Sequence, residues 1–438
     1  MFKRNLPLMV TIMVFVLGYL LCLASFPAFM STRIICNILT DNAFLGIVAV
    51  GMTFVILSGG IDLSVGAVIA FTGVLLAKLI GDLGVSPMLA IPLVLVLGAG
   101  FGALMGWLID TLKIPAFIIT LAGMFFLRGA SFLISEQSLS IDHPTFTYLS
   151  SLSWKVPGGG RLSLLALIML AVVVLGILLA NRTRFGNNVY AIGGNATSAA
   201  LMGISVRHTT IRIYLLSTTL ATLAGIVFAL YTSAGYPLAA VGVELDAIAA
   251  VVIGGTLLSG GVGTVFGSLF GVLIQGLIQT YINFDGTLSS WWTKIIIGLL
   301  LFCFIGLQRL LILVSEHRKA NKPTPFKRQV AAIPLECRPH RARHTRARWH
   351  ASRTHCADLT PPGSEPQTKE PGLSDNASNN GHTDNGQTPW WHRRRMPTAK
   401  RRKQDHNKAK RKRKAHREGM RGRWRASSCP HKVDYQEV

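Results

Sequence analysis

The chain repeats one glycine-rich motif inside two apolar stretches, GMTFVILSGGIDLSVGAVIAFTG (residues 51–73) and VVIGGTLLSGGVGTVFGSLFGVLIQ (residues 251–275). In both, Leu-Ser-Gly-Gly interrupts a segment that is otherwise apolar enough to enter a bilayer. A helix that breaks inside lipid frees backbone N–H and C=O groups, which are tolerated only when buried in protein or lining a wet cavity. Paired breaks in corresponding positions of two halves are typical of a transport path. The repeat therefore predicts a duplicated membrane unit with a path between its halves.

Apolar segments fill most of the first 314 residues. A transmembrane helix needs about 20 apolar residues, and most of the segments reach that length. The two short segments that end in the repeated motif are 43–58 and 245–258. The predicted spans are 6–30, 43–58, 64–81, 88–109, 115–134, 162–180, 213–232, 245–258, 262–282 and 292–314. This pattern predicts an all-α polytopic membrane protein of about ten transmembrane helices with an internal two-half repeat.

Charge divides the chain at about residue 315. Residues 1–314 carry 14 Lys and Arg and 9 Asp and Glu, a net charge of +5, whereas residues 315–438 carry 30 and 11, a net charge of +19. The second part has basic clusters, no apolar periodicity and many polar residues, which is typical of disorder. We therefore predict a transmembrane domain over 1–314 and a disordered basic tail over 315–438. The charge of this tail does not indicate a specific nucleic-acid partner.

Basic residues near the ends of the spans predict the orientation of the chain in the membrane. Four basic regions fall on one side of a ten-span arrangement: Lys3 and Arg4, Lys113, Arg182 to Arg212, and the region after the last span. Loops rich in Lys and Arg face the cytoplasm. Both termini are therefore predicted to be cytoplasmic.

The residues of the two breaks are the candidates for a translocation path or hinge. Asp62 either lines the path or steadies the hinge, or else Asp62 or Ser64 caps the following helix. In both cases the carboxylate must face protein or water, because an acid is costly in lipid. Ser58, Ser259 and Thr264 are interpreted mainly as hydrogen-bond partners of the local backbone. The candidate set is Ser58, Gly59, Gly60, Asp62, Ser64, Ser259, Gly260 and Gly261.

Glycines in the breaks are predicted to tolerate substitution less well than glycines within a span. Glycine permits a positive φ and a close backbone approach, at which a β-branched residue would clash. We expect Val at Gly60 or Gly261 to be more harmful than Val at Gly98 or Gly106. The latter two are interpreted as tolerant helix-packing positions.

Three further charged residues lie in or beside the predicted spans. Arg128 either pairs with an inward-facing acid or extends to the outer headgroups. Glu244 and Asp246 either complement the dipole of the helix that they begin or stand at the outer mouth of a path.

The segment from Asn181 to Arg212, NRTRFGNNVYAIGGNATSAALMGISVRHTTIR, is too polar to span a membrane. The Gly-Gly-Asn sequence at 193–195 predicts a loop that leads into a short helix over 196–202, with Asn195 or Thr197 as its cap. Such a helix on the cytoplasmic side suits docking into the groove of a partner, whereas an ordinary ordered loop is the alternative. The candidate docking residues are Gly193, Gly194, Asn195, Ala199, Ala200 and Gly203.

The predicted outer loop over 135–161 carries Glu136, Asp142, His143 and a triple glycine at 158–160. It is interpreted as a surface element able to meet an external partner. One His without a second ligand at metal spacing does not indicate a metal site. We predict no catalytic residues, no metal site and no cofactor on this chain.

Three other classes of protein are weighed against a permease. Leu-Ser-Gly-Gly also occurs in ATPases, but the chain has no G-x-x-x-x-G-K-[ST] loop to hold nucleotide phosphates. An ion-coupled secondary transporter with duplicated halves is the alternative function. It predicts several paired charged groups within the spans, and only Asp62 and Arg128 come close. The apolar spans oppose a nucleic-acid-binding protein.

Four stretches carry a family likeness. GMTFVILSGGIDLSVGAVIAFTG (51–73), KIPAFIITLAGMFFLRG (113–129), RFGNNVYAIGGNATSAALMGI (184–204) and VVIGGTLLSGGVGTVFGSLFGVLIQ (251–275) resemble the ribose/galactose/xylose-type permeases of bacterial ABC importers. The likeness covers about residues 1–320. The chain is also similar to permeases of galactofuranose importers, through QTYINFDGTLSSWWTKI (279–295).

The resemblance implies a multi-pass permease of the cell inner membrane that takes up galactofuranose or a related monosaccharide. Its implied partners are a separate ATPase subunit that binds ATP, a homologous second permease, a periplasmic sugar-binding protein and membrane lipid. Residues 191–204 would form the coupling helix that meets the ATPase, and Asp62 with the paired breaks would flank the path. The tail departs from the family, whose members end soon after the last span.

Overall fold

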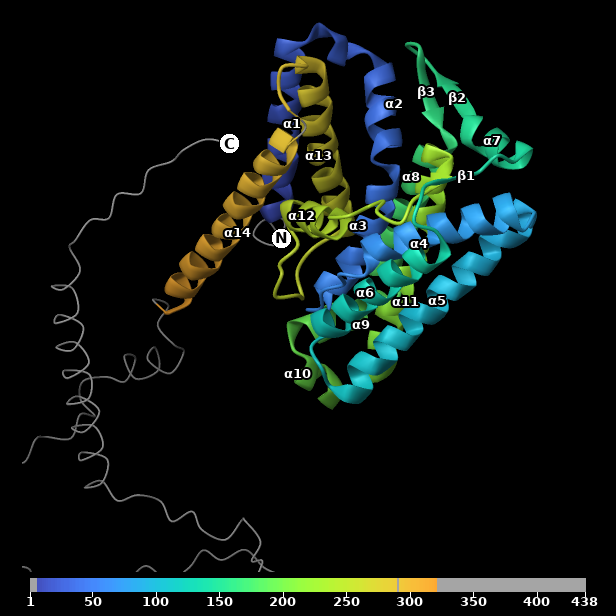
Figure 1. The fold of residues 1–438 in the computed structure, drawn as a ribbon. Helices are drawn as coiled ribbons and strands as arrows, with labels where there is room; N and C mark the ends of the chain where they lie inside the picture. Colours follow the sequence, from blue (N-terminus) through green and yellow to red (C-terminus); the bar gives the residue numbers. More distant parts are fainter. Residues whose placement is uncertain (1–5, 290, 321–438) are drawn as a thin grey trace, which may run out of the picture. The chain divides into compact units, whose positions relative to one another are not determined.

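The computed structural model describes residues 6–289 and 291–320, and nearly all of the elements in this part of the chain are α-helices (Figure 1). Each of the ten predicted apolar segments contains a helix. The apolar helices are α1 (Leu6–Ser25), α2 (Thr32–Asp41), α3 (Ala43–Leu57), α4 (Val65–Ala77), α5 (Pro87–Leu112), α6 (Ala116–Ile134), α8 (Leu164–Arg182), α11 (Val206–Thr232), α12 (Val243–Ile253), α13 (Val265–Asp285) and α14 (Trp291–Ala320). Short helices η2 (Pro27–Met30) and η3 (Lys78–Asp82) follow α1 and α4. The fold is that of an all-α polytopic membrane protein.

The predicted count of ten spans is not confirmed. Within the described residues, eight helices are long and apolar enough to cross a membrane, and α2 with α3, bent by 56°, makes a ninth. The remaining helix, α12, has 11 residues and rises only about 16 Å. The second repeated motif therefore follows a half-length helix, whereas the first follows a bent pair of full length.

The helix α3 forms the centre of the hydrophobic core, and all of its residues except Phe44 are buried. It packs against α8, α11, α12 and α13. A hydrogen bond of 2.7 Å between Thr53 Oγ1 and Ser268 Oγ joins α3 to α13, so a buried polar contact connects the two repeats. Few residues of the helices α1 and α14 are buried, as expected for faces that meet lipid or another subunit.

The glycines of α5 do not behave as predicted. The faces of α5 and α11 meet so closely that a Cβ at Gly98 or Gly102 would overlap Thr222 or Thr218, and one at Gly106 would lie 2.7 Å from the Ile211 Cα. The expectation that Gly98 and Gly106 tolerate a larger residue was therefore wrong. Small residues at i, i+4 and i+8 let two backbones approach, and here that approach leaves no room.

The loop between α6 and α8 is ordered into short elements. Strand β1 (Leu139–Ser140) pairs antiparallel with β4 (Ala234–Gly235), and α7 (Pro144–Ser151) follows β1. Strands β2 (Ser153–Val156) and β3 (Gly160–Ser163) form a hairpin whose turn uses two glycines of the predicted triple run, both at positive φ. The β1–β4 pair links the loop after α6 to the loop after α11.

The loops and short helices that connect the long helices lie at two opposite ends of the helix bundle. Figure 1 shows α10 (Ala196–Leu201) near the α5–α6 connection at one end, and α7 with the β2–β3 hairpin at the other. At the α10 end, Arg207 of α11 lies 3.9 Å from Asp110 of α5. Leu8 of α1 and Asn181 of α8 line one cavity. Three of the regions predicted to be cytoplasmic thus share an end, and which side of the membrane it faces stays a prediction.

Candidate functional site: the junction of two broken helices

The first break, residues 58–64, begins with a tight turn at the end of α3. The Ser58 hydroxyl donates to the Val55 carbonyl over 2.7 Å, which confirms its predicted role as a local backbone partner. Gly59 follows at a φ of +83°. Beyond the turn, the Thr120 hydroxyl of α6 donates to the Ile61 carbonyl over 3.2 Å. A backbone carbonyl freed by this break is therefore hydrogen-bonded by a protein side chain and is not left unsatisfied in lipid.

Asp62 is fully buried inside the first break. Its Oδ1 accepts hydrogen bonds from the Ser64 N–H over 3.0 Å and the Ser64 hydroxyl over 2.7 Å. Its Oδ2 accepts from the Ser217 hydroxyl of α11 over 2.8 Å. Three donors satisfy a carboxylate that would otherwise be costly in this apolar setting. Asp62 thus steadies the break and attaches it to α11.

The predicted helix cap takes a different form from the one expected. Ser64 is the N-cap residue of α4, but its side chain accepts no hydrogen bond from the helix. Asp62 accepts the N–H of Ser64 itself, one residue before the helical turn. The N–H of the N-cap residue is therefore bonded by Asp62 of the break, and the usual bond from the N-cap side chain to the N–H of the second or third helical residue is not formed.

The second break, residues 254–264, depends on glycine backbone. Positive φ angles occur at Gly255, Gly260, Gly261 and Gly263, a conformation that L side chains rarely adopt. The Thr264 hydroxyl caps α13 by accepting the Gly267 N–H over 3.0 Å, as predicted. Ser259 is exposed. No acid or base lies within this break.

The two breaks touch each other through their backbones. The Gly261 N–H donates to the Leu57 carbonyl, the last residue of α3, over 2.9 Å. A Cβ added at Gly260 would lie 2.9 Å from the Gly59 nitrogen. Two motifs that are 201 residues apart in sequence therefore form one site, which the repeat alone did not predict.

The polar segment after α8 forms two helices rather than a loop and one helix. Helix α9 (Arg184–Gly194) includes Gly193 and Gly194 in its last turn, where a loop was expected. Asn195 caps α10, accepting the Ser198 N–H at Oδ1 over 2.8 Å, which confirms the predicted cap. Helix α10 ends at Leu201, one residue short of the expected end, and Gly203 follows at a φ of +84°.

The candidate docking residues of α10 differ in exposure. Ala199 is buried, whereas Ala200 is exposed. The next two side chains, Leu201 and Met202, are 86% and 73% exposed. These two large apolar side chains at the end of α10 are accessible for contact with another molecule.

The end of α9 meets both breaks. A methyl group added at Gly193 would overlap the Leu57 carbonyl oxygen and lie 2.5 Å from the Gly261 nitrogen. The Tyr190 hydroxyl donates to the Gly263 carbonyl over 2.9 Å. The predicted path residues and the predicted docking segment are therefore neighbours. Tyr190 was missed because nothing in the local sequence marks a partner 73 residues away.

A cavity of about 470 Å³ opens beside the second break. Leu8, Asn181, Asn187 and Tyr190 line it together with four glycines of the break, and none of the lining residues that the structure describes is charged. Amide side chains and exposed peptide groups both donate and accept hydrogen bonds. A lining of this kind suits a neutral, hydroxyl-rich molecule.

Polar residues of α11 complete the site and were not predicted. Ser217 bonds Asp62, and the buried Tyr214 hydroxyl lies where a Cβ on Gly60 would meet it. Thr218 and Thr222 continue the same helix face toward α5. Hydroxyl residues recurring every three or four positions in an apolar span are the signal that would have identified this face.

Arg128 interacts electrostatically with the acid Glu244, and its direct hydrogen bonds go to backbone carbonyls. Its Nη1 donates to the carbonyls of Pro237 and Ala239 over 2.6 and 2.8 Å, which ties α6 to the segment before α12. Glu244 and Asp246 stand in the first turn of α12, as the dipole interpretation expected. Asp246 also forms an ion pair with Lys294 of α14.

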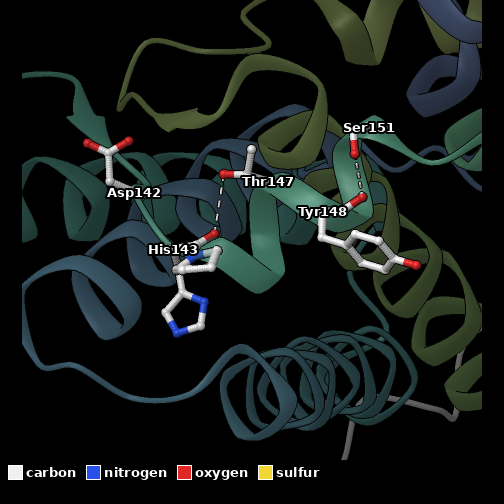
Figure 2. Close-up of a pocket in the computed structure, with 6 residues that line it drawn as sticks. Asp142, His143, Thr147, Tyr148 and Ser151 are labelled. Carbon is white, nitrogen blue, oxygen red and sulfur yellow. Dashed lines mark hydrogen bonds between the residues drawn. The ribbon is translucent and has the colours of Figure 1, made fainter.

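The opposite end carries a shallow, open hollow beside α7. Figure 2 shows Asp142, His143, Thr147, Tyr148 and Ser151 around it. The His143 ring accepts the Thr145 N–H over 3.2 Å as the cap of α7, and Phe146 is fully buried beneath the helix. His143 therefore has a structural role as a helix cap, and the described lining of the hollow offers a carboxylate, hydroxyl groups and an aromatic ring for contact.

Comparison with known proteins identifies the family. Residues 34–305 match the model of the permease component of the branched-chain amino acid transport system. The chain belongs to this permease family. It is 78% identical over 324 residues to the inner membrane ABC transporter permease protein YjfF of Escherichia coli K12, a match covering 74% of this chain and 98% of that protein.

Two further relatives carry the names of sugar permeases. The fructose import permease protein FruG of Bifidobacterium longum is 38% identical over 72% of this chain and 94% of its own length. The ribose import permease protein RbsC of Escherichia coli K12 is 38% identical over 62% and 84%. No solved structure matches the chain.

Proposed function

We propose that this chain is the membrane subunit of an ATP-driven importer that moves a monosaccharide across the bacterial inner membrane. The observation that carries the proposal is the joining of the two broken helices at Leu57 and Gly261 in a chain of the permease family. Broken helices of two repeats that meet at one place are typical of a transport path. The relatives named for fructose and ribose import support a sugar as the substrate.

The substrate that we propose is galactofuranose or a closely related monosaccharide. The support is the resemblance of residues 279–295 and of the motif-bearing stretches to permeases of galactofuranose importers. The neutral, amide-lined cavity beside the second break is compatible with an uncharged polyhydroxyl molecule. The break residues Ser58, Gly59, Gly60, Asp62, Ser64, Ser259, Gly260 and Gly261 would flank the path.

The partners that we propose follow from the two ends of the helix bundle, one at α10 and the other at α7. A separate ATPase, which binds and hydrolyses ATP, would receive α10 with the exposed Leu201 and Met202 in an apolar groove. A periplasmic sugar-binding protein would dock on the polar surface of α7 at the other end (Figure 2). A homologous permease would cover one of the exposed apolar helix faces, and lipid would cover the rest. With the ATPase on the α10 side, both termini would be cytoplasmic, as the basic regions of the sequence predict.

Reconstitution tests the substrate and the energy source together. The chain is inserted into liposomes with the ATPase, the second permease and the binding protein, and uptake of labelled galactofuranose, ribose, xylose and fructose is measured with and without ATP. We expect ATP-dependent uptake with galactofuranose preferred. Uptake that follows an ion gradient and ignores ATP would instead identify a secondary transporter, and preference for another sugar would overturn the substrate.

The role of α10 is tested with two neighbouring alanines. Ala200→Glu places a charge on the exposed face, and we expect loss of ATP-driven uptake while the protein still inserts. Ala199→Glu is not an equivalent variant, because Ala199 is buried and the charge would first disturb the packing of α10. Co-purification with the ATPase gives the measurement, and an Ala200→Glu chain that binds and couples normally would contradict the docking role.

A further inference from the structure

The C-terminal turn of α9, which directly precedes α10, contacts both broken helices. Gly193 fits against the Leu57 carbonyl and the Gly261 nitrogen, so closely that no Cβ is possible without moving one of them. Its own carbonyl oxygen lies 3.1 Å from where a Cβ on Gly260 would stand. The last turn of α9 therefore packs against the junction at which the two breaks meet.

Two other contacts hold α9 in this position. The rings of Phe185 of α9 and Phe54 of α3 lie 5.8 Å apart between centroids. The Tyr190 hydroxyl bonds the Gly263 carbonyl of the second break over 2.9 Å. One face of α9 thus contacts the end of α3, and the same helix contacts the second break by a separate hydrogen bond.

We propose that Gly193 is a positioning residue that transmits movement of α10 to both breaks at once, through the backbone contact at Leu57 and Gly261. This inference rests on the proposed function, because it assumes that an ATPase moves α10. The connection between α10 and α9 is a single residue, Asn195, whose side chain caps α10. A displacement of α10 therefore reaches Gly193 across only two residues, Gly194 and Asn195.

At this contact a small shift of Gly193 changes two elements together. The Gly261 N–H to Leu57 carbonyl bond joins α3 to the second break, and Gly193 packs against both atoms of that bond. Moving Gly193 away loosens the bond, and pressing it inward separates the two backbones. A packed junction of this kind has discrete arrangements and is not continuously deformable.

The chain offers a matched pair of variants for the test. Gly193→Ala adds a methyl group at the junction, whereas Gly194→Ala adds the same group at the next residue, where nothing lies within 4 Å. Tyr190→Phe is a milder third variant that removes the hydroxyl that donates to the Gly263 carbonyl. The assembled complex is assayed for uptake and for ATP hydrolysis with and without sugar-loaded binding protein. Hydrogen exchange of residues 254–264 is measured with and without ATP.

We expect Gly193→Ala to lower uptake and stimulated ATP hydrolysis by about tenfold, because couplings between two sites commonly change an equilibrium by about that factor. Unstimulated ATP hydrolysis should continue. The ATP-dependent change in exchange at 254–264 is expected to disappear in Gly193→Ala and to persist in Gly194→Ala. Equal coupling and equal exchange in the two alanine variants overturns the inference. If Gly193→Ala does not assemble, Tyr190→Phe decides: reduced coupling supports the inference, and wild-type coupling overturns it.

The exchange measurement separates this inference from the proposed function. If the wild-type complex takes up none of the tested sugars, the proposed substrate fails. The response of residues 254–264 to ATP in the wild type and its loss in Gly193→Ala would still establish the connection. If the wild type transports and both alanine variants do so equally, the proposed function stands and the inference fails.

Discussion

The first and second breaks share the sequence Leu-Ser-Gly-Gly but are held in different ways. The first is held by side chains: Asp62 accepts three hydrogen bonds, and Thr120 bonds the backbone at Ile61. The second contains no charged group, and four of its glycines adopt positive φ. One break is thus fixed around a buried carboxylate, whereas the other depends on glycine backbone conformation together with neutral side-chain bonds from Tyr190 and Gln308.

The comparison shows that a repeated motif specifies a turn but not the support around it. A buried carboxylate whose donors are all in place gives a rigid segment, because any movement that separates the carboxylate from its donors leaves buried polar groups unsatisfied. A glycine-rich segment has fewer such constraints and adapts to its neighbours. We expect the first break to behave as the fixed element of the pair and the second as the element that moves.

The largest effect is expected for Gly261→Val in the second break. Gly261 has a φ of +76°, and an added Cβ would lie 3.0 Å from the Gly194 nitrogen. A left-handed conformation alone costs a side chain about 1–2 kcal/mol, so uptake by the inserted protein should fall by roughly tenfold or more.

The matched control for this variant is Gly100→Val, because nothing lies within 4 Å of Gly100. Gly98 and Gly106, which seemed suitable from the sequence, are in tight contact with α11 and are unsuitable. Gly261→Ala should already be harmful, since one methyl group is incompatible with the backbone angle. Uptake by Gly261→Val equal to that of Gly100→Val, each normalised to inserted protein, would show that the second break needs no glycine.

The next largest effect is expected for Asp62→Ala in the first break. Alanine leaves the Ser64 N–H and the hydroxyls of Ser64 and Ser217 buried without their acceptor. Each unsatisfied group costs about 1–3 kcal/mol, so the purified protein should unfold at a clearly lower temperature. Asp62→Asn is the control, since its carbonyl can still accept from Ser64 and the Ser217 hydroxyl can rotate to accept from its amide. Equal destabilisation by the two variants would mean that the charge, rather than the network, holds the break.

The local features of this molecule could be predicted from the sequence, and its long-range contacts could not. The spans, the breaks and the Asn195 cap follow from apolar runs, glycine pairs and a capping residue, each of which is a local pattern. The convergence of Leu57, Gly193 and Gly261 depends on how three distant segments pack, and no spacing encodes it. The same holds for Arg128, whose acceptors are backbone carbonyls about 110 residues later, since any residue type supplies a carbonyl.

A smaller effect is expected for two single variants that each remove one hydroxyl, Ser217→Ala in α11 and Ser268→Ala in α13. Ser217→Ala removes a bond to the charged Asp62, and Ser268→Ala removes a bond between two neutral hydroxyls, Ser268 and Thr53. Bonds to charged groups contribute about 1.5–3 kcal/mol and neutral ones about 1 kcal/mol. Thermal unfolding should therefore show the larger loss for Ser217→Ala. A larger loss for Ser268→Ala would indicate that the link between α3 and α13 matters more than the network around the first break.

The smallest effect is expected for Gln308→Leu, which tests how little side-chain support the second break needs. The Gln308 amide is buried and donates to the carbonyls of Val252 and Thr256 over 3.3 and 3.4 Å, long distances for such bonds. Its loss should lower stability by no more than about 1 kcal/mol, with uptake close to wild type. Gln275→Leu is the control, because it removes a shorter amide bond of 3.0 Å to Asp246 at the other end of α12. If Gln308→Leu proves as damaging as Asp62→Ala, the second break is also held by side chains, and the distinction between a fixed and a moving break does not hold.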